Sequence, residues 1–133
     1  MKLEYQPQRD AEFFEAIKKA VNKAEGRITL KQAIESAIMT PTSSFFLTDR
    51  RIAEIIRNFG SDPPPVSDAK RKQHIELWTR YLVLQNIHRN LTAEEIAKTY
   101  IAHQPASRFF ISPARAVNIY CNELRRRQKA RRK

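Results

Sequence analysis

The chain has 133 residues, of which 41% are hydrophobic, and it contains only 2 Gly. No apolar run approaches the length of a membrane-spanning helix, and the single Cys121 excludes internal disulfides, so we expect a cytoplasmic protein without a membrane segment. The formal net charge is +11, and residues 125–133 hold seven of the 25 basic residues and no acidic one. Such a run attracts polyanions by counterion release, which indicates nucleic acid as a partner.

Residues 9–60 are predicted to form a first repeat of three helices. An amphipathic helix begins at Asp10, and Gly26 ends it because the C-terminus of a helix often needs a residue with positive φ. The second helix begins at Thr29, which is expected to form a capping box with Gln32.

A short extended apolar link, residues 45–47, is predicted to precede the third helix. Thr48 is the expected N-cap of that helix, and Gly60 ends it. The Pro-rich segment 61–67 favours an extended, semi-rigid conformation, because consecutive prolines lack backbone donors. We therefore expect this segment to link the first repeat to a second one.

Residues 68–124 are predicted to repeat the plan. A long helix comes first, followed by a capping box of Thr92 with Glu95, a second extended link at 109–111 and a helix that begins at Ser112. The side chains expected on the inward side of the long helix are Ile75, Trp78, Leu82, Leu84 and Ile87. The pattern predicts an all-α protein of about six helices.

Part of the sequence occurs twice, and this is the main reason to expect two repeats. Residues 41–51 and 105–115 share Pro, Ser, Phe, Phe and Arg at the same spacing, with an offset of 64 residues. A period of this length corresponds to one supersecondary unit. We therefore predict a duplicated three-helix unit with two similar surfaces.

Residues 91–97, Leu-Thr-Ala-Glu-Glu-Ile-Ala, resemble the first helix of a helix-turn-helix DNA-binding motif. In that motif a polar, capped start leads to an Ile-Ala pair that packs on the next helix. The resemblance covers roughly residues 92–124, and 29–59 by repetition, and it implies a following helix that reads DNA. The chain departs from the motif because about ten residues separate its helices, where the usual turn has three or four.

The helix from Ser112 is the element predicted to contact nucleic acid. Its apolar stripe must face the core, so its other side presents arginine and asparagine, which suit bidentate contacts with guanine and adenine. The basic tail, residues 125–133, supplies further cations for phosphate groups. The candidate nucleic-acid-binding residues are Arg51, Arg108, Arg115, Asn118, Asn122, Arg125, Arg126, Arg127, Lys129, Arg131, Arg132 and Lys133.

The two repeats are not expected to bind equally. Arg51 and Arg115 occupy corresponding positions and are the leading candidates for phosphate contacts, with a salt bridge inside the protein as their alternative role. Glu54 occupies the position that corresponds to Asn118, and a carboxylate there would repel phosphate.

No pattern typical of an enzyme or of a metal site stands out. Three scattered histidines do not form a metal motif, and two glycines leave no Gly-rich phosphate loop. The predicted function is therefore non-catalytic DNA binding, in transcription or in a mobile element, without cofactor or metal. The alternatives are RNA binding and a protein-interaction adaptor that uses the repeated Pro-x-Ser-x-Phe-Phe loops, with the basic tail only aiding solubility.

Overall fold

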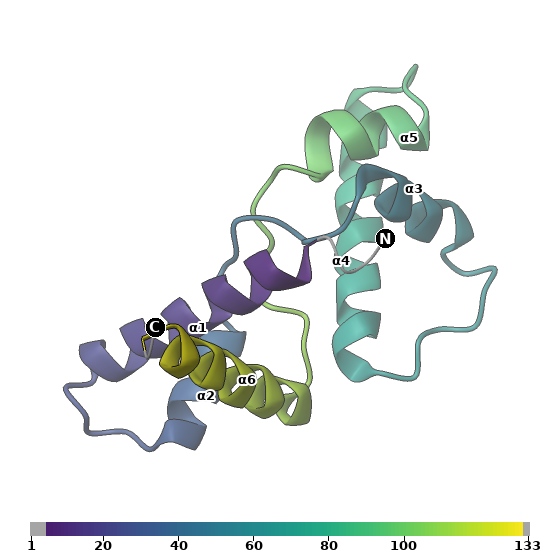
Figure 1. Cartoon of the computed structure of the whole chain (residues 1–133). Coiled ribbons are helices and arrows are strands. Elements are labelled where there is room, and N and C mark those ends of the chain that lie inside the picture. The colour runs from purple at the N-terminus through teal and green to yellow at the C-terminus, as the bar shows by residue number, and fades with distance from the viewer. Residues whose placement is uncertain (1–4, 132–133) are drawn as a thin grey trace. The chain divides into compact units, whose positions relative to one another are not determined.

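The computed structural model describes residues 5–131, and these residues form six α-helices and one π-helical segment, without a β-strand (Figure 1). The all-α prediction is confirmed. In chain order the elements are α1 (Gln6–Lys23), α2 (Leu30–Ile38), α3 (Asp49–Asn58), α4 (Asp68–Ile87), α5 (Ala93–Ile96), η2 (Ala97–Ile101) and α6 (Pro113–Arg131).

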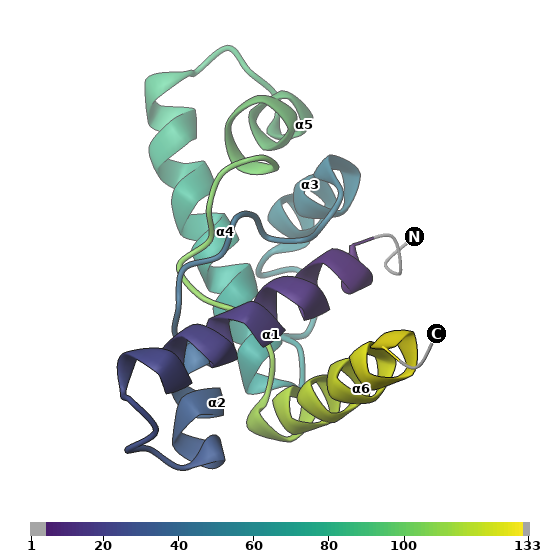
Figure 2. The same ribbon diagram turned by 60° about the vertical axis from the view of Figure 1, so that its left-hand side comes forward.

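The helices form two compact units that alternate along the sequence. Among the described residues, unit 1 comprises 5–42 and 107–131, whereas unit 2 comprises 43–106. In unit 1, α1 packs against α2, and both helices pack against α6 (Figure 2). In unit 2, α3 packs against α4, α5 and the π-helical segment η2.

The compact units do not follow the predicted repeats, 9–60 and 68–124. Each unit contains the first two helices of one repeat and the third helix of the other, because α6 joins α1 and α2 while α3 joins α4 and α5. The Pro-rich segment 61–67, predicted to link two domains, therefore lies inside unit 2 and connects α3 to α4. The chain instead passes between the units at 42–43 and 106–107.

Both predicted capping boxes are present. Thr29 accepts a hydrogen bond from the backbone N–H of Gln32, whose side chain accepts one from the N–H of Thr29. Thr92 and Glu95 make the same pair of hydrogen bonds at the start of α5. Each box satisfies two backbone donors that the first turn of a helix leaves unpaired, so α2 and α5 begin where the sequence predicts.

The first helix begins earlier than predicted, at Gln6 instead of Asp10. Pro7 lies in its first turn, where a missing backbone N–H costs no hydrogen bond and the fixed φ suits a helix. The N–H of Arg9 donates to the carbonyl of Tyr5 at 2.9 Å and closes that turn. The helix therefore begins three residues before residue 9, the predicted start of the first repeat.

The two segments predicted as extended links contain no strand. Phe46 has a φ of 57°, in the left-handed region, so residues 45–47 bend at their centre. Residues 109–111 have no regular structure. The first ring of each pair is a core anchor, since Phe45 in unit 2 and Phe109 in unit 1 are 3% and 2% exposed. Neither of these two rings is accessible to a partner.

The core of unit 1 forms around Phe13 of α1. This side chain is fully buried and meets the Phe109 ring edge-on, with the ring centroids 5.1 Å apart. The adjacent Phe14 stacks on Tyr120 of α6 at 5.5 Å. Such aromatic pairs add to the free energy gained from burial of their surface. The Phe14–Tyr120 pair holds α6 against α1, and the Phe13–Phe109 pair holds the loop before α6 against α1.

The core of unit 2 combines aliphatic side chains with the Phe45 ring. Leu77 is the one buried residue of α4, and Ile52 of α3 is buried as completely. Trp78 is half-buried and stacks on Phe59 with the ring centroids 5.0 Å apart. The predicted inward side of α4 is wrong for three residues: Ile75, Leu82 and Ile87 are exposed.

The π-helical segment η2 accommodates one more residue than the corresponding part of α2. Thr29 and Thr92 lie 63 residues apart, whereas the Pro-x-Ser-x-Phe-Phe segments that follow lie 64 apart. In η2 the N–H of Ala102 donates at 2.8 Å to the carbonyl of Ala97, five residues back. An α-helix uses the residue four back, so the wider turn absorbs the extra residue and keeps Ile101 buried.

Candidate nucleic-acid interface on unit 1

The helix α6 begins where predicted and continues through most of the basic tail. The hydroxyl of Ser112 accepts a hydrogen bond from the N–H of Arg115 at 3.2 Å, which caps the helix. Residues 125–131 belong to α6 and do not form a separate tail. Arg132 and Lys133 of the predicted site lie outside the described residues.

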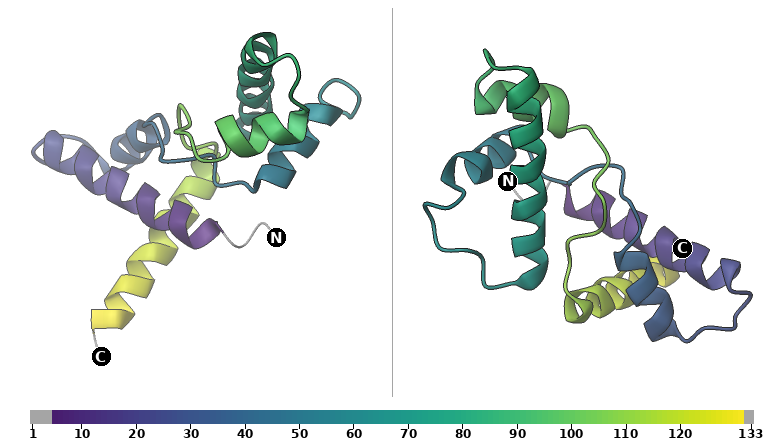
Figure 3. Two further views of the ribbon diagram at one scale, coloured as in Figure 1. Left: turned by 90° about the horizontal axis from the view of Figure 1, so that it is seen from above. Right: turned by 180° about the vertical axis from the view of Figure 1, so that it is seen from behind.

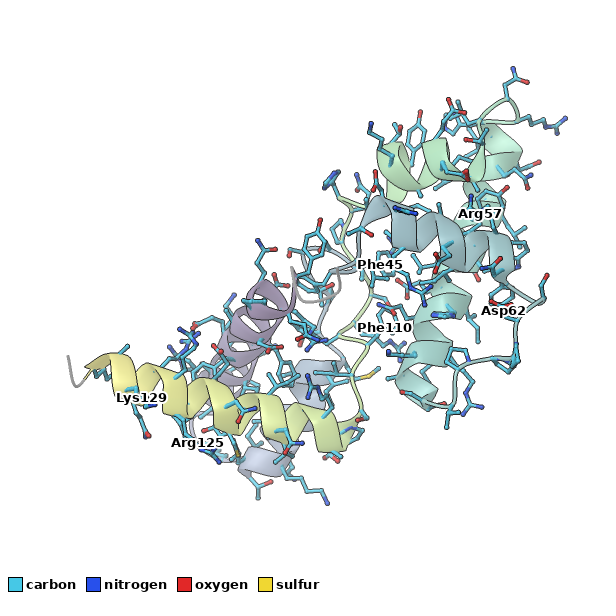
Figure 4. All side chains as sticks on the ribbon, turned by 45° about the vertical axis from the view of Figure 1, so that its right-hand side comes forward. Phe45, Arg57, Asp62, Phe110, Arg125 and Lys129 are labelled. Atoms are coloured by element: carbon cyan, nitrogen blue, oxygen red, sulfur yellow. The ribbon has the colours of Figure 1, made fainter. Side chains whose placement is uncertain are left out.

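One side of α6 is buried and the other is exposed. Ala116, Ile119 and Glu123 form the buried side. Six of the exposed residues are polar and recur every three or four positions, so they share one face. They are Arg115, Asn118, Asn122, Arg125, Arg126 and Lys129. Figure 4 labels Arg125 and Lys129 on this helix. We call these six residues the α6 face; all six belong to the predicted site.

Two arginines at the end of α6 are bound within unit 1. Arg126 donates two hydrogen bonds to the carboxylate of Glu123, at 3.0 and 2.9 Å. Arg127 donates to Glu15 of α1 at 2.8 Å, and its guanidinium lies over the Phe14 ring, 4.2 Å from the centroid. Arg127 therefore attaches α6 to α1 and is a structural residue more than a contact for phosphate.

Both carboxylates in this cluster keep their charge at lower pH than usual. The hydrogen bond from Arg126 lowers the pKa of Glu123, and the hydrogen bond from Arg127 lowers the pKa of Glu15. Glu123 is the one acidic residue of segment 107–133, which holds nine Lys and Arg residues. Glu123 is buried and pairs with Arg126 and Arg127, so its negative charge is compensated by these two arginines. The α6 face therefore remains cationic.

Two predicted site residues lie away from the α6 face. Arg51 belongs to α3 in unit 2, where its guanidinium pairs with Glu54. Arg108 lies in the loop before α6, and its guanidinium contacts the sulfur of Met39 at 3.8 Å. The structure therefore brings together the predicted residues of α6 but does not add these two arginines to them.

The helix α3, which corresponds to α6 at the 64-residue offset, has a different surface. Arg57 pairs with Glu94 of α5 at 3.1 Å, and Arg51 pairs with Glu54. Figure 4 labels Arg57 on this helix. Two of the three arginines of α3 have carboxylate partners inside unit 2, while Arg50 is exposed, so α3 offers less free positive charge than the α6 face.

The helices predicted to form each helix-turn-helix motif do not share a unit. α2 lies in unit 1 while α3 lies in unit 2, and α5 lies in unit 2 while α6 lies in unit 1. In unit 1, α2 packs instead against α6, which is far from it in the sequence. Neither of the predicted pairs, α2 with α3 and α5 with α6, therefore lies within one unit.

Unit 1 presents further cations that the predicted site omits. Lys18, Lys19 and Lys23 are exposed on α1, and Lys18 lies 3.6 Å from Glu15. Their position outside an apolar stripe was visible in the sequence. That α1 packs against α6 was not, because the Glu15–Arg127 contact joins residues 112 apart.

Unit 2 contains a pocket that the sequence does not reveal. It measures about 470 Å³ and lies between the end of α3, the Pro-rich segment and the start of α4. His74 is half-buried in its wall, and burial, followed by the nearby Arg51, lowers the pKa of that imidazole. The wall combines apolar rings with two carboxylates, Glu54 and Asp62, and two arginines, Arg51 and Arg71.

No family model matches this chain, and comparisons with curated proteins and with solved structures find no match. None of the described helices is long and apolar enough to cross a membrane. Residues 5–131 also contain no group of three or more His, Cys, Asp or Glu side chains arranged to hold a metal ion. Function is therefore inferred from the surfaces of the two units.

Proposed function

We propose that this protein binds DNA without catalysis, through the α6 face of unit 1. The observation that carries the proposal is that Asn118 and Asn122 are exposed on the same face as Arg115, Arg125 and Lys129. Cationic side chains bind phosphate groups, and asparagine suits a bidentate contact with adenine. An α-helix fits the major groove of B-form DNA, where those base edges are accessible.

The two ends of α6 suit different tasks. Asn118 and Asn122 lie in its first half, whereas Arg125, Lys129 and Arg131 follow in its second half. With 19 residues the helix is about 28 Å long, so its halves reach different parts of a binding site. The first half would contact bases and the second half phosphates. The packing of α2 against α6 gives α6 a support like that of a recognition helix.

The phosphate contacts are tested by charge removal that spares Arg127. The test variant combines Arg125→Gln, Lys129→Gln and Arg131→Gln. The control removes the same charge from α1 in the same unit and combines Lys18→Gln, Lys19→Gln and Lys23→Gln. Loss of three phosphate contacts should reduce the slope of log affinity against log salt by up to about 2.7 in the test variant. The control should retain most of the slope.

Fluorescence anisotropy with a labelled DNA duplex at several salt concentrations measures both slopes. Equal losses in the two variants would mean that the total charge of unit 1, and not α6, drives binding. Unchanged binding in both would contradict the proposal.

The base contacts are tested with Asn118→Ala and Asn122→Ala. Each variant and the parent chain are used to select oligonucleotides from random DNA and RNA pools. We expect the parent to enrich a DNA motif and each alanine variant to lose preference at one position, since a good bidentate contact contributes about 1–3 kcal/mol to discrimination. Enrichment of RNA over DNA would favour the RNA-binding alternative instead.

A further inference from the structure

The helix α4 carries an exposed apolar stripe that the core of unit 2 does not use. The stripe consists of Ile75, Leu82, Val83 and Ile87, which are 54%, 45%, 56% and 66% exposed. At 3.6 residues per turn these four positions share roughly 140° of the helix circumference, and the buried Leu77 lies on the other side. Figure 3 shows α4 with the other helices of unit 2 from two further directions.

The corresponding helix of unit 1 shows that packing does not require this stripe. Leu77 of α4 corresponds to Phe13 of α1 at the 64-residue offset, and both are fully buried, which fixes the register. At the same offset, Leu82, Val83 and Ile87 correspond to Lys18, Lys19 and Lys23. A helix that makes similar contacts in its unit therefore has solvated charges at three of the positions where α4 is apolar.

The C-terminal end of the stripe has a hollow and a cation. The hollow measures about 370 Å³ and is lined by Leu82, Gln85, Asn86 and Arg89. Among the described residues, Arg89 has no carboxylate partner, and its Nε donates only to the carbonyl of Asn86 at 3.4 Å. Its charge is therefore available to a molecule that covers the stripe.

The N-terminal end has the same combination. The pocket between α3, the Pro-rich segment and α4 includes Ile75 of the stripe and Arg71, one turn earlier. Arg71 is exposed and lies 3.9 Å from Asp68, at the limit of an ion pair. Each end of the stripe thus joins an aliphatic side chain to a hollow and an exposed arginine.

We propose that the stripe binds an amphipathic helix of a protein partner with acidic residues near its ends. Aliphatic side chains of that helix cover the stripe, and its carboxylates meet Arg71 and Arg89. These arginines are 18 residues apart, so the partner helix spans about 27 Å, or five turns. This surface lies in unit 2 and is independent of the DNA contact proposed for unit 1.

A second copy of α4 fits this stripe poorly. An antiparallel pair would place Arg71 of one chain near Arg89 of the other, and a parallel pair would place identical arginines together, so like charges would meet in both cases.

The fluorescence of Trp78 reports on binding to the stripe. It is the only tryptophan, and it lies half-buried on α4 beside the stripe. The probe is a synthetic helical peptide of about 18 residues with a leucine stripe and glutamates near both ends, and its control has lysines in place of the glutamates. We expect the glutamate peptide to change the Trp78 emission saturably and to bind at least about tenfold more tightly than the lysine peptide.

The matched variant of the protein gives α4 the lysines that α1 has at the corresponding positions. It combines Leu82→Lys, Val83→Lys and Ile87→Lys. We expect it to keep its helical circular dichroism and its melting temperature, because α1 has these residues, and to lose affinity for the glutamate peptide at least about tenfold. A second variant, Arg71→Gln with Arg89→Gln, leaves the stripe intact and should abolish discrimination between the two peptides.

Three outcomes would overturn the proposal. The first is equal binding of both peptides, or binding of neither, to the parent chain. The second is self-association in sedimentation analysis that the triple-lysine variant abolishes, which would make the stripe an interface between copies. The third is loss of DNA binding in that variant, which would make the stripe a nucleic-acid surface.

Discussion

The helix α1 of unit 1 and the helix α4 of unit 2 each pack against two other helices, yet their outer surfaces are opposite in character. Lys18, Lys19 and Lys23 are exposed on α1, and aliphatic side chains are exposed at the corresponding positions of α4. The third helices differ as well, since α6 presents asparagines and cations while α3 pairs Arg51 with Glu54. Phe13 and Leu77, which correspond at the 64-residue offset, are buried in both helices, whereas the outer positions differ and are available for different partners.

The largest expected effect on stability comes from truncating the buried core residue of α1 in unit 1 or of α4 in unit 2. Phe13→Ala should destabilise unit 1 by about 3–5 kcal/mol and Leu77→Ala unit 2 by about 2–5 kcal/mol, because each leaves a cavity. Amide hydrogen exchange measures both units at once. Phe13→Ala should accelerate exchange in α1, α2 and α6 while unit 2 keeps its protection. Equal acceleration throughout the chain would mean that the two units unfold as one.

A smaller effect distinguishes two sides of α6 near its C-terminal end. Arg127→Ala should destabilise unit 1 by about 1–2 kcal/mol, because it removes the ion pair with Glu15 and the cover of the Phe14 ring. Arg125→Ala, on the α6 face, should change stability by less than about 0.5 kcal/mol. Urea denaturation measures both. Similar losses in the two variants would show that Arg127 does not attach α6 to α1.

The smallest effect concerns pH and unit 2. Burial lowers the pKa of His74, so the unfolded chain binds a proton more readily than the folded one. This contribution to stability is present above the ordinary histidine pKa and is lost as the pH falls through the lowered value. The urea midpoint of unit 2 should therefore decrease between about pH 7 and pH 5, and His74→Gln should reduce that decrease. An identical decrease in the variant would assign the effect to other groups.

Local signals explain the parts of the fold that the sequence predicts. Each capping box joins residues three positions apart, so Thr29 and Thr92 mark the starts of α2 and α5 without knowledge of the tertiary structure. The packing of α6 in unit 1 and of α3 in unit 2 is different, because it depends on contacts between helices far apart in the sequence or outside the predicted repeat. Nothing in the spacing of Ile52 or Ala116 indicates which pair of helices will cover it.

The same limit applies to the surfaces. The sequence predicted Asn118 and Asn122 on the exposed side of α6, and both are exposed. On α4, apolar residues occupy much of the circumference, and the pattern did not show that Leu77 faces the core while Ile75 and Leu82 face solvent. The role of Arg127 depends on a residue 112 positions away, which no local pattern reveals.

Nuclear magnetic resonance of the full chain with the selected DNA duplex tests the central claim most directly. The side-chain amide signals of Asn118 and Asn122 report on base contacts, and the backbone signals of α6 report on docking of the helix. We predict that these signals shift on addition of DNA while those of α3 and α4 do not. Shifts confined to unit 2, or none at all along α6, would contradict a DNA-binding role for the α6 face.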